Sequence, residues 1–136
     1  MIISNFAEEL KLSSLFETNT DINVEGVYIG DLLSIVMSKA KQNYVWITIQ
    51  THINTIAVAE LLDLSCIIVV EGMEVEQETI EKAKELNIPI FKTNESAYEI
   101  ACRLKNLGIK WNIFTIYIYI LIYHPVEVKI WHLTIL

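Results

Sequence analysis

Apolar residues in the first part of the chain fall into short runs that alternate with segments of helical spacing. The runs are rich in β-branched and aromatic residues, which predicts strands. They cover residues 24–30, 44–50, 65–71 and 88–93. The run at 65–71, SCIIVVE, is apolar almost throughout, as is typical of a strand covered on both faces of a parallel sheet. Strand and helix alternation implies right-handed crossovers, so the sequence predicts an α/β fold whose mostly parallel sheet has about four strands and helices on both faces.

Helical spacing of apolar residues fills the intervals around these strands. The predicted helices cover residues 2–12, 31–41, 52–63, 74–87 and 95–108. The segment 52–63 is apolar nearly all round, so we expect it to be buried. The segment 74–87 has one narrow apolar stripe and many glutamates, which indicates an outer helix. Gly108 is expected to close the last helix at the C′ position.

The C-terminal residues 109–136 differ from the rest of the chain, since they contain only one glutamate and two lysines. We therefore divide the chain into an α/β domain at 1–108 and an apolar extension at 109–136. Alternation in IYIYILIY favours a β-hairpin turning at His124 and Pro125 and buried at an oligomer interface, while a poorly ordered or non-native extension is the other interpretation. The uninterrupted run of 11 residues at 113–123 is shorter than the roughly 20 that a membrane span needs.

Composition narrows the functional classes. A length of 136 residues fits one domain. The formal net charge of −7 argues against a nucleic-acid surface, which needs lysine and arginine to replace counterions on phosphate. The N-terminus lacks the basic and apolar regions of a signal peptide, and the two cysteines, Cys66 and Cys102, have no metal-ligand spacing. We expect a cytoplasmic protein with reduced thiols.

Polar clusters follow each predicted strand. In an open α/β sheet, ligands bind beyond the carboxyl ends of the strands, where loops and helix N-termini gather. The predicted ligand-binding residues are Gly30, Asp31, Gln50, Thr51, His52, Asn54, Glu71, Gly72, Lys92 and Thr93, with Asn94 beside them. Their convergence depends on the parallel pairing of the strands.

Each of these residues also has a structural interpretation. Asp31 is well placed to cap the helix that follows it, and Thr51 is placed to cap the next helix. Gly30 and Gly72 supply turns that other residues adopt poorly. His52 is the most informative residue, because its pKa ordinarily lies near neutrality and it is expected on the first turn of a buried helix. A histidine without a serine, cysteine or carboxylate partner at a recognisable spacing is more often structural than catalytic.

Catalytic motifs are absent from the sequence. It contains no GxxxxGK[ST], GxGxxG, HExxH, CxxC or GxSxG pattern. We therefore predict no catalytic residue, no metal site and no cofactor. An anionic ligand can still bind to backbone N–H groups and helix N-termini without any of these motifs.

The segment ITIQTHINTIAVAELLDLSCIIVVEG, at 47–72, resembles the DRTGG domain family in the order and spacing of its strands, turns and helix. The resemblance extends over about residues 2–108. At the turn where the family has Asp-Arg, this chain has Thr51 and His52. Where the family has Thr-Gly-Gly, this chain has Val-Glu-Gly at 70–72.

The resemblance implies a regulatory or assembly module. Such domains are fused to CBS-domain pyrophosphatases and to phosphotransacetylases, and their fold is similar to the N-terminal domain of HPr kinase/phosphorylase. In the pyrophosphatases the module lies at a dimer interface and contributes to adenine-nucleotide regulation. The resemblance does not extend to kinase activity, because the catalytic phosphate loop is missing.

Three functions are therefore compared. The first is a non-enzymatic homodimer that regulates or assembles with a metabolic enzyme and senses a small anionic metabolite or adenine nucleotide at the strand ends. The second is a pure interaction subunit of a metabolic enzyme complex that binds no ligand. The third is a small enzyme that uses His52 as an acid or base. Neither nucleic acid nor membrane is an expected partner.

Overall fold

A computed structural model of the protein describes residues 1–109, so the predicted hairpin and nearly all of the C-terminal extension lie outside the described residues. The predicted boundary after residue 108 stays a prediction. The strands are β1 (Ile2–Ile3), β2 (Ser13–Ser14), β3 (Ile22–Asn23), β4 (Gly26–Ile29), β5 (Tyr44–Thr48), β6 (Cys66–Val69) and β7 (Ile90–Lys92). The helices are α1 (Phe6–Glu9), α2 (Leu33–Lys39), α3 (Asn54–Leu62), α4 (Gln77–Leu86) and α5 (Ala97–Asn106).

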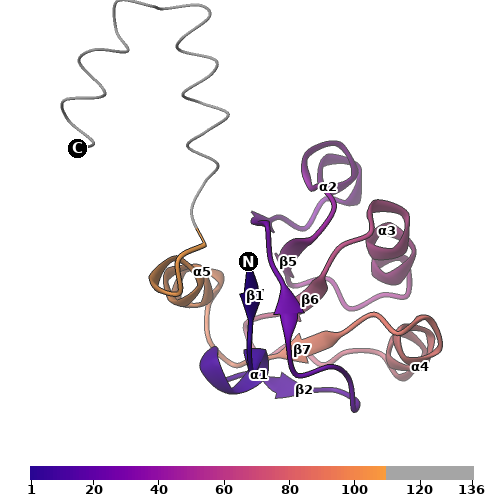
Figure 1. Cartoon of the computed structure of the whole chain (residues 1–136). Helices are drawn as coiled ribbons and strands as arrows, with labels where there is room; N and C mark the ends of the chain where they lie inside the picture. Colours follow the sequence, from indigo (N-terminus) through magenta and orange to yellow (C-terminus); the bar gives the residue numbers. More distant parts are fainter. Residues whose placement is uncertain (110–136) are drawn as a thin grey trace, which may run out of the picture.

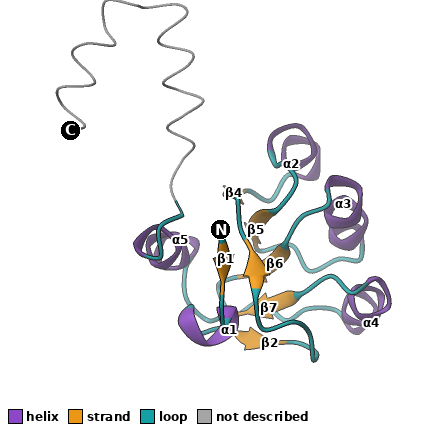
Figure 2. Ribbon diagram, viewed as in Figure 1, coloured by secondary structure: helices purple, strands orange, loops and turns teal. Residues whose placement is uncertain are grey.

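The described part of the chain has three layers, with the main sheet in the middle (Figures 1 and 2). Helices α2, α3 and α4 cover one face, and α1, α5 and a small β1–β3 sheet cover the other. The main sheet has the order β2-β7-β6-β5-β4. Its last four strands are parallel, which confirms the predicted α/β fold.

Three short strands were not predicted from the sequence. β2 adds a fifth strand to the main sheet, antiparallel to β7, and β1 pairs with β3 to form the small sheet. Each of the three has two residues, and β2 consists of two exposed serines. Two residues show no period-2 alternation, so their pairing depends on neighbours far away in the sequence.

Residues of the central strands alternate between two hydrophobic cores. Trp46 of β5 packs with α2, α3 and α4, whereas its neighbours Val45 and Ile47 pack with α1 and α5. All three side chains are completely buried. The Trp46 indole donates its Nε1–H to the Gly30 carbonyl oxygen at 2.8 Å, which satisfies the polar atom of the largest buried side chain.

Two helix predictions need correction. The expected fully buried helix is α3, but only one of its faces is buried, and Leu61 on the other face is 69% exposed. Layer geometry explains this, since α3 has the sheet on one side only. The predicted helix at 2–12 is reduced to the four-residue α1, because Ile3 belongs to β1.

Other helix predictions are confirmed. Helix α4 buries a narrow stripe that includes Ala83 and exposes its glutamates. Gly108 follows the end of α5 with φ of 101°, a conformation that favours glycine. None of the helices within residues 1–109 has the length and apolar character needed to cross a bilayer.

Phe6 anchors the short α1 to the sheet. Its ring is fully buried and lies 5.3 Å, centroid to centroid, from the ring of Phe91 in β7. Its backbone N–H also donates to the Thr20 carbonyl oxygen, which joins α1 to the loop before β3. A helix of four residues has no stability of its own, so this packing holds it in place.

We predict that Phe6→Ala lowers the free energy of unfolding by about 3–5 kcal/mol, because it removes a buried ring and leaves a cavity. Urea denaturation measures the change. Tyr98→Ala is the control, since Tyr98 is 77% exposed and its truncation should change stability by less than about 0.5 kcal/mol. Equal effects of the two substitutions would show that the α1 layer does not stabilise the domain.

Candidate functional site

The carboxyl ends of β4 and β5 are tied together by Asp31. One carboxylate oxygen, Oδ1, accepts from the Thr48 hydroxyl at 2.9 Å and from the Ile49 backbone N–H at 3.0 Å. The Asp31 carbonyl oxygen accepts from the Gln50 side-chain amide at 2.8 Å. The turn after β4 and the turn after β5 therefore form one hydrogen-bonded unit.

This arrangement corrects both predicted helix caps. Helix α2 begins after Leu32, and no side chain caps it, because the Asp31 carboxylate is bonded across to the neighbouring strand. Thr51 likewise caps no helix, since α3 begins only at Asn54. The carbonyl oxygen of Thr51 accepts from the Thr79 hydroxyl at 2.8 Å, which fixes the turn to α4.

His52 lies in the turn just before α3 and is exposed, so the expected position on the first turn of a buried helix is wrong. Its Nδ1 accepts from the Asn54 backbone N–H at 3.2 Å, and its carbonyl oxygen accepts from the Thr55 hydroxyl. A neutral ring that accepts through Nδ1 carries its proton on Nε2. His52 therefore presents an outward N–H donor.

The turn after β6 has an unusual backbone. Glu71 and Gly72 have φ of 62° and 65°, a left-handed conformation that a non-glycine residue such as Glu71 adopts rarely. Their N–H groups donate to the carbonyl oxygens of Glu95 and Thr93, so the turn is attached to the end of β7. A Cβ at position 72 would lie 2.9 Å from the Asn94 side-chain oxygen, which explains why glycine occupies it.

Gly30 is constrained differently from Gly72. Its φ is not in the left-handed region, and a Cβ there would lie 2.8 Å from the Tyr28 ring. Its N–H donates to the Ile47 carbonyl oxygen, and its carbonyl oxygen accepts from the Trp46 indole N–H. The predicted glycine turn is therefore present at Gly72, whereas close packing accounts for Gly30.

Two ion pairs dominate the electrostatics at the end of β7. The Lys92 ammonium lies 2.7 Å from the Glu74 carboxylate, and the Arg103 guanidinium makes two hydrogen bonds to Glu95. Arg103 also donates to the Leu10 carbonyl oxygen, which connects α5 to the N-terminal segment. The hydrogen bond from Arg103 holds the pKa of the Glu95 carboxyl below its ordinary value of 4.5.

The arrangement brings the predicted residues to one edge in two hydrogen-bonded groups. Asp31, Gln50 and the turn before α3 form the first group, and Glu71, Gly72 and Thr93 form the second. The two groups are joined through the β5–β6 pairing, where the Val70 N–H donates to the Thr48 carbonyl oxygen. Whether these residues bind a ligand stays a prediction.

The groups at this edge are polar side chains and backbone groups contributed by several elements. Much of its polar capacity is used within the fold, and the His52 N–H, the Asn54 and Asn94 amides and the Lys92 ammonium are the groups best placed to meet a ligand. Within residues 1–109, no group of three His, Cys, Asp or Glu side chains is arranged to hold a metal ion. Cys66 is completely buried, and burial raises the pKa of its thiol, which disfavours the nucleophilic thiolate.

Sequence reasoning missed the residues that support the site from other elements. Thr48 lies inside a strand, Thr79 lies on α4 and Arg103 lies on α5. Only the Asn-Glu-Ser loop after β7 gave a signal, because Ser96 precedes the helix and its hydroxyl oxygen accepts from the Glu99 N–H. Glu95 in this loop was overlooked although it bonds to Arg103.

The sequence model of the DRTGG domain matches residues 7–107. The chain belongs to the DRTGG domain family. The predicted resemblance is thereby confirmed. No curated protein matches the chain.

A solved structure shares the DRTGG fold. It contains the CBS and DRTGG domains of the regulatory region of Clostridium perfringens pyrophosphatase, complexed with the activator diadenosine tetraphosphate. The TM-score is 0.56 at 17% sequence identity, and the match covers 74% of this chain and 44% of that chain. This chain therefore spans less than half of the regulatory region that it matches.

We predict that Glu95→Gln destabilises the protein more at about pH 6 than at about pH 3. The folded-state pKa of Glu95 is lowered, so its ionised form stabilises the fold above the ordinary pKa of 4.5, and this contribution is lost as the pH falls through the folded-state value. Urea midpoints across this pH range measure the effect. Glu81→Gln, at an exposed position of α4, is the matched control. A difference between Glu95→Gln and the natural chain that does not vary with pH would contradict the role of the Arg103 pair.

Proposed function

We propose that this DRTGG domain is a non-enzymatic regulatory or assembly module, a cytoplasmic homodimer that acts on a partner metabolic enzyme and senses a small anionic metabolite or adenine nucleotide at its strand-end edge. Family membership is the observation that carries this proposal. The pyrophosphatase region with the shared fold supports it, because that region is regulatory and was crystallised with an adenine-nucleotide activator.

The edge offers two groups suited to an anion. Lys92 provides a positive charge, and the His52 Nε2–H provides a hydrogen-bond donor. Glu74 competes with any anion for Lys92, since its carboxylate is 87% exposed and already bonded to the ammonium. A phosphate that binds here must therefore displace the Glu74 carboxylate from Lys92.

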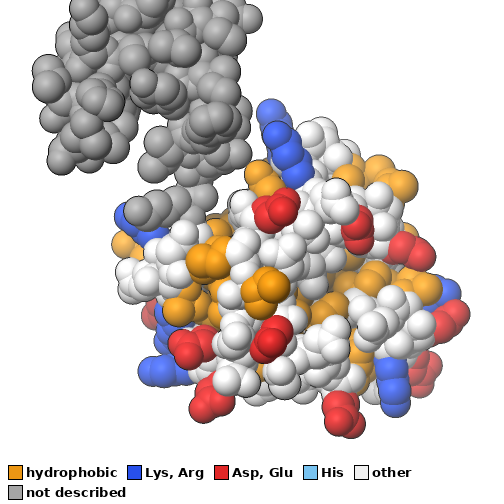
Figure 3. Space-filling model, in the orientation of Figure 1, with side chains coloured by type: hydrophobic (Ala, Val, Ile, Leu, Met, Phe, Trp, Pro, Cys, Tyr) orange, Lys and Arg blue, Asp and Glu red, His pale blue; other side chains and the backbone are white. Residues whose placement is uncertain are grey.

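The charges around the edge favour the second candidate, a pure interaction subunit that binds no ligand. Carboxylates of Asp31, Glu71, Glu74 and Glu95 surround the strand ends, and they repel an anion. Acidic side chains are also interspersed with apolar ones on a different face, shown in Figure 3, which carries β1 and the N-terminus; basic side chains lie mainly at the margin of that view. Under this interpretation the polar turns serve only to shape a docking surface.

We predict that an adenine nucleotide or acetyl phosphate raises the melting temperature of the protein by several degrees, since a ligand present at about 100 times its Kd adds roughly 2.7 kcal/mol to the stability. His52→Ala and Lys92→Ala should abolish the shift. Glu74→Gln should enlarge it, because it frees the Lys92 ammonium from its carboxylate partner. The panel contains AMP, ADP, ATP, diadenosine tetraphosphate and acetyl phosphate, and differential scanning fluorimetry measures the response.

Lys84→Ala is the matched control, as it removes the same charge from an exposed position on α4. A ligand shift that survives both His52→Ala and Lys92→Ala would place the binding site elsewhere. An absence of response to every compound would favour the interaction subunit.

Apolar side chains exposed at the same edge support assembly into a dimer. Ile29 ends β4, Ile49 follows β5, and Leu32 precedes α2, with exposed fractions of 49%, 42% and 61%. The carboxylate of Asp31, which precedes Leu32, accepts a hydrogen bond from the Ile49 N–H, so Leu32 and Ile49 lie on the same hydrogen-bonded pair of turns. A second copy of the chain can cover such a group symmetrically across a twofold axis.

We predict that the protein sediments as a dimer and that Leu32→Asp shifts it to the monomer, because a charge would be buried in the interface. Analytical ultracentrifugation measures the mass. Leu61→Asp is the matched control, since Leu61 is 69% exposed on the outer face of α3, away from the Asp31 unit, and its substitution should leave the dimer intact. Dissociation by Leu61→Asp and not by Leu32→Asp would move the interface to α3.

A chain shortened after Gly108 that remains folded and dimeric would exclude an interface role for the extension.

A further inference from the structure

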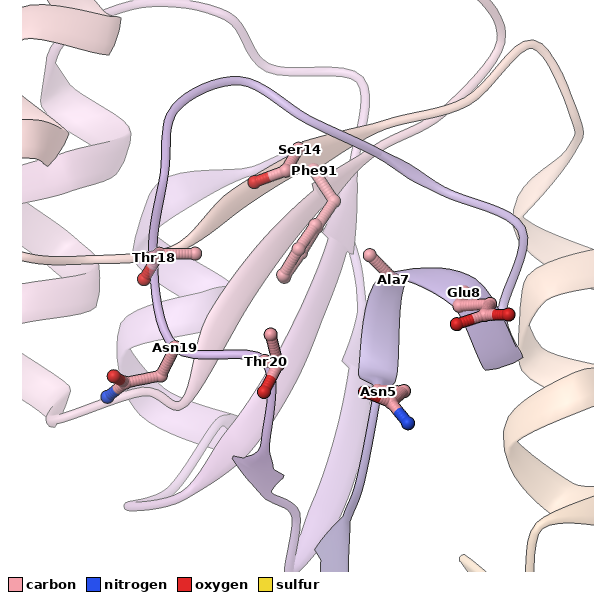
Figure 4. A pocket seen from close by; sticks show the side chains of 8 residues that line it. All are labelled: Asn5, Ala7, Glu8, Ser14, Thr18, Asn19, Thr20 and Phe91. Atoms are coloured by element: carbon pink, nitrogen blue, oxygen red, sulfur yellow. The ribbon is translucent and has the colours of Figure 1, made fainter.

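The main sheet ends in β2 on one side and in β4 on the other. β2 has two residues, both exposed serines, and an edge strand this short offers few backbone groups for pairing. In the loop after it, Thr18 and Thr20 line a hollow of about 180 Å³ with Phe91 of β7, so the chain stays close to that strand (Figure 4). β4 is the longer edge strand, and among residues 1–109 it pairs with β5 alone.

The backbone of β4 turns every second residue toward β5. Directly after the strand, the Gly30 N–H donates to the Ile47 carbonyl oxygen of β5 at 3.1 Å. Since successive residues of a strand direct their N–H and C=O groups to opposite sides, Tyr28 also faces β5, whereas Val27 and Ile29 face outward. No residue within 1–109 forms a backbone hydrogen bond to these outward N–H and C=O groups. The outer edge of β4 is therefore available for pairing with another strand.

The side chains of β4 make this edge apolar. Ile29 is 49% exposed, and Val27 and Tyr28 are half-buried. Val27 packs with the core on the α1 and α5 side, and Tyr28 packs with the core on the α2 side. Neither lysine nor proline, which commonly protect edge strands, occurs in β4. An unpaired apolar edge without such protection favours the addition of a strand.

A second copy of β4 complements this edge fully. In an antiparallel pair with a twofold axis at Tyr28, Val27 of each copy lies opposite Ile29 of the other. Each of these two pairs exchanges two N–H···O=C hydrogen bonds, so every outward group of both strands is used. β4 carries no charged side chain, and the Asp31 carboxylate beyond its end is bonded to Thr48 and to the Ile49 N–H, toward β5. Like charges within the paired segment therefore do not oppose the contact.

We propose that two copies of the chain pair through the outer edges of their β4 strands, antiparallel and with Tyr28 on the twofold axis. Their main sheets then form one continuous sheet across the dimer. This inference rests on the proposed homodimer and specifies the contact that holds it. The exposed side chain of Leu32, three residues after β4, continues the apolar surface beside the paired strands.

Disulfide trapping in the full chain tests the register. The twofold axis places position 28 of the two copies directly opposite each other in a non-hydrogen-bonded pair, with Cα atoms about 4.5 Å apart. A disulfide joins Cα atoms about 4.4–6.8 Å apart. With oxidised glutathione as the oxidant, we expect Tyr28→Cys to give a linked dimer on non-reducing electrophoresis. Cys102→Ser is introduced beforehand to remove the half-buried thiol, while Cys66 is completely buried.

Ile29→Cys, in the same background, is the matched control. Position 29 is more exposed than position 28, so random collision would link it more readily. In the proposed register it lies opposite position 27 of the second copy, two residues away from its own counterpart, and Cα atoms more than about 7 Å apart cannot be bridged. Ile29→Cys should therefore give little or no linked dimer. More linking of Ile29→Cys than of Tyr28→Cys would overturn the proposed register.

Hydrogen exchange of the natural chain needs no substitution, so it also serves if Tyr28→Cys fails to fold. The Val27 and Ile29 N–H groups should exchange about tenfold or more slowly in the dimer than after dilution to the monomer. The Gly30 N–H, bonded to Ile47, is the internal control and should be protected in both states. Mass spectrometry with residue resolution measures the exchange, and sedimentation measures the mass.

The outcomes separate this inference from the proposed homodimer. A dimer whose Val27 and Ile29 N–H groups exchange as fast as in the monomer would overturn the β4 pairing and leave the homodimer standing. A monomer at every concentration would contradict the homodimer and the pairing together. Protection of these two N–H groups in the monomer would assign the edge to a segment of the same chain and overturn the pairing between copies.

Discussion

Burial of β5 and β6 on both faces is the constraint on which the rest of the structure depends. A strand buried on two sides requires helices on two sides, and only crossover connections place them there while keeping the strands parallel. The alternation of Val45, Trp46 and Ile47 between two cores meets this requirement. Once the strands are parallel, their carboxyl ends meet at one edge, so the position of the candidate site follows from this pairing.

At the carboxyl edge, the fold already uses polar atoms that the proposed ligand would need. Asp31 connects the turns after β4 and β5, and the Thr93 carbonyl oxygen, which accepts from the Gly72 N–H, connects the turns after β6 and β7. The Glu95–Arg103 pair attaches the loop after β7 to α5. Such bonds make the turns rigid, which benefits binding because less conformational entropy is lost. They also leave few groups for a ligand. These are chiefly the His52 N–H and the Lys92 ammonium, whose ion pair with Glu74 would have to break.

The sequence was sufficient to predict the four parallel strands, because long β-branched runs such as Cys66–Val69 have no stable alternative to burial in a sheet. It was insufficient for β2, whose two serines pair only because β7 offers a free edge. The predictions of helix caps were wrong for a related reason. Asp31 precedes an apolar helix as a cap does, but its carboxylate has a stronger set of donors in Thr48 and Ile49, which adjacency in the sequence cannot show.

The two edges differ in the kind of group that the fold leaves unused. Turns at the carboxyl edge are short and held by charged side chains, so their backbone groups are satisfied internally. At the amino edge, the loop between β2 and β3 buries the Thr18 hydroxyl, which has no hydrogen-bond partner among residues 1–109. Burying a hydroxyl without a partner costs free energy, and the packing of the Phe6 and Phe91 rings in the same layer helps to offset that cost.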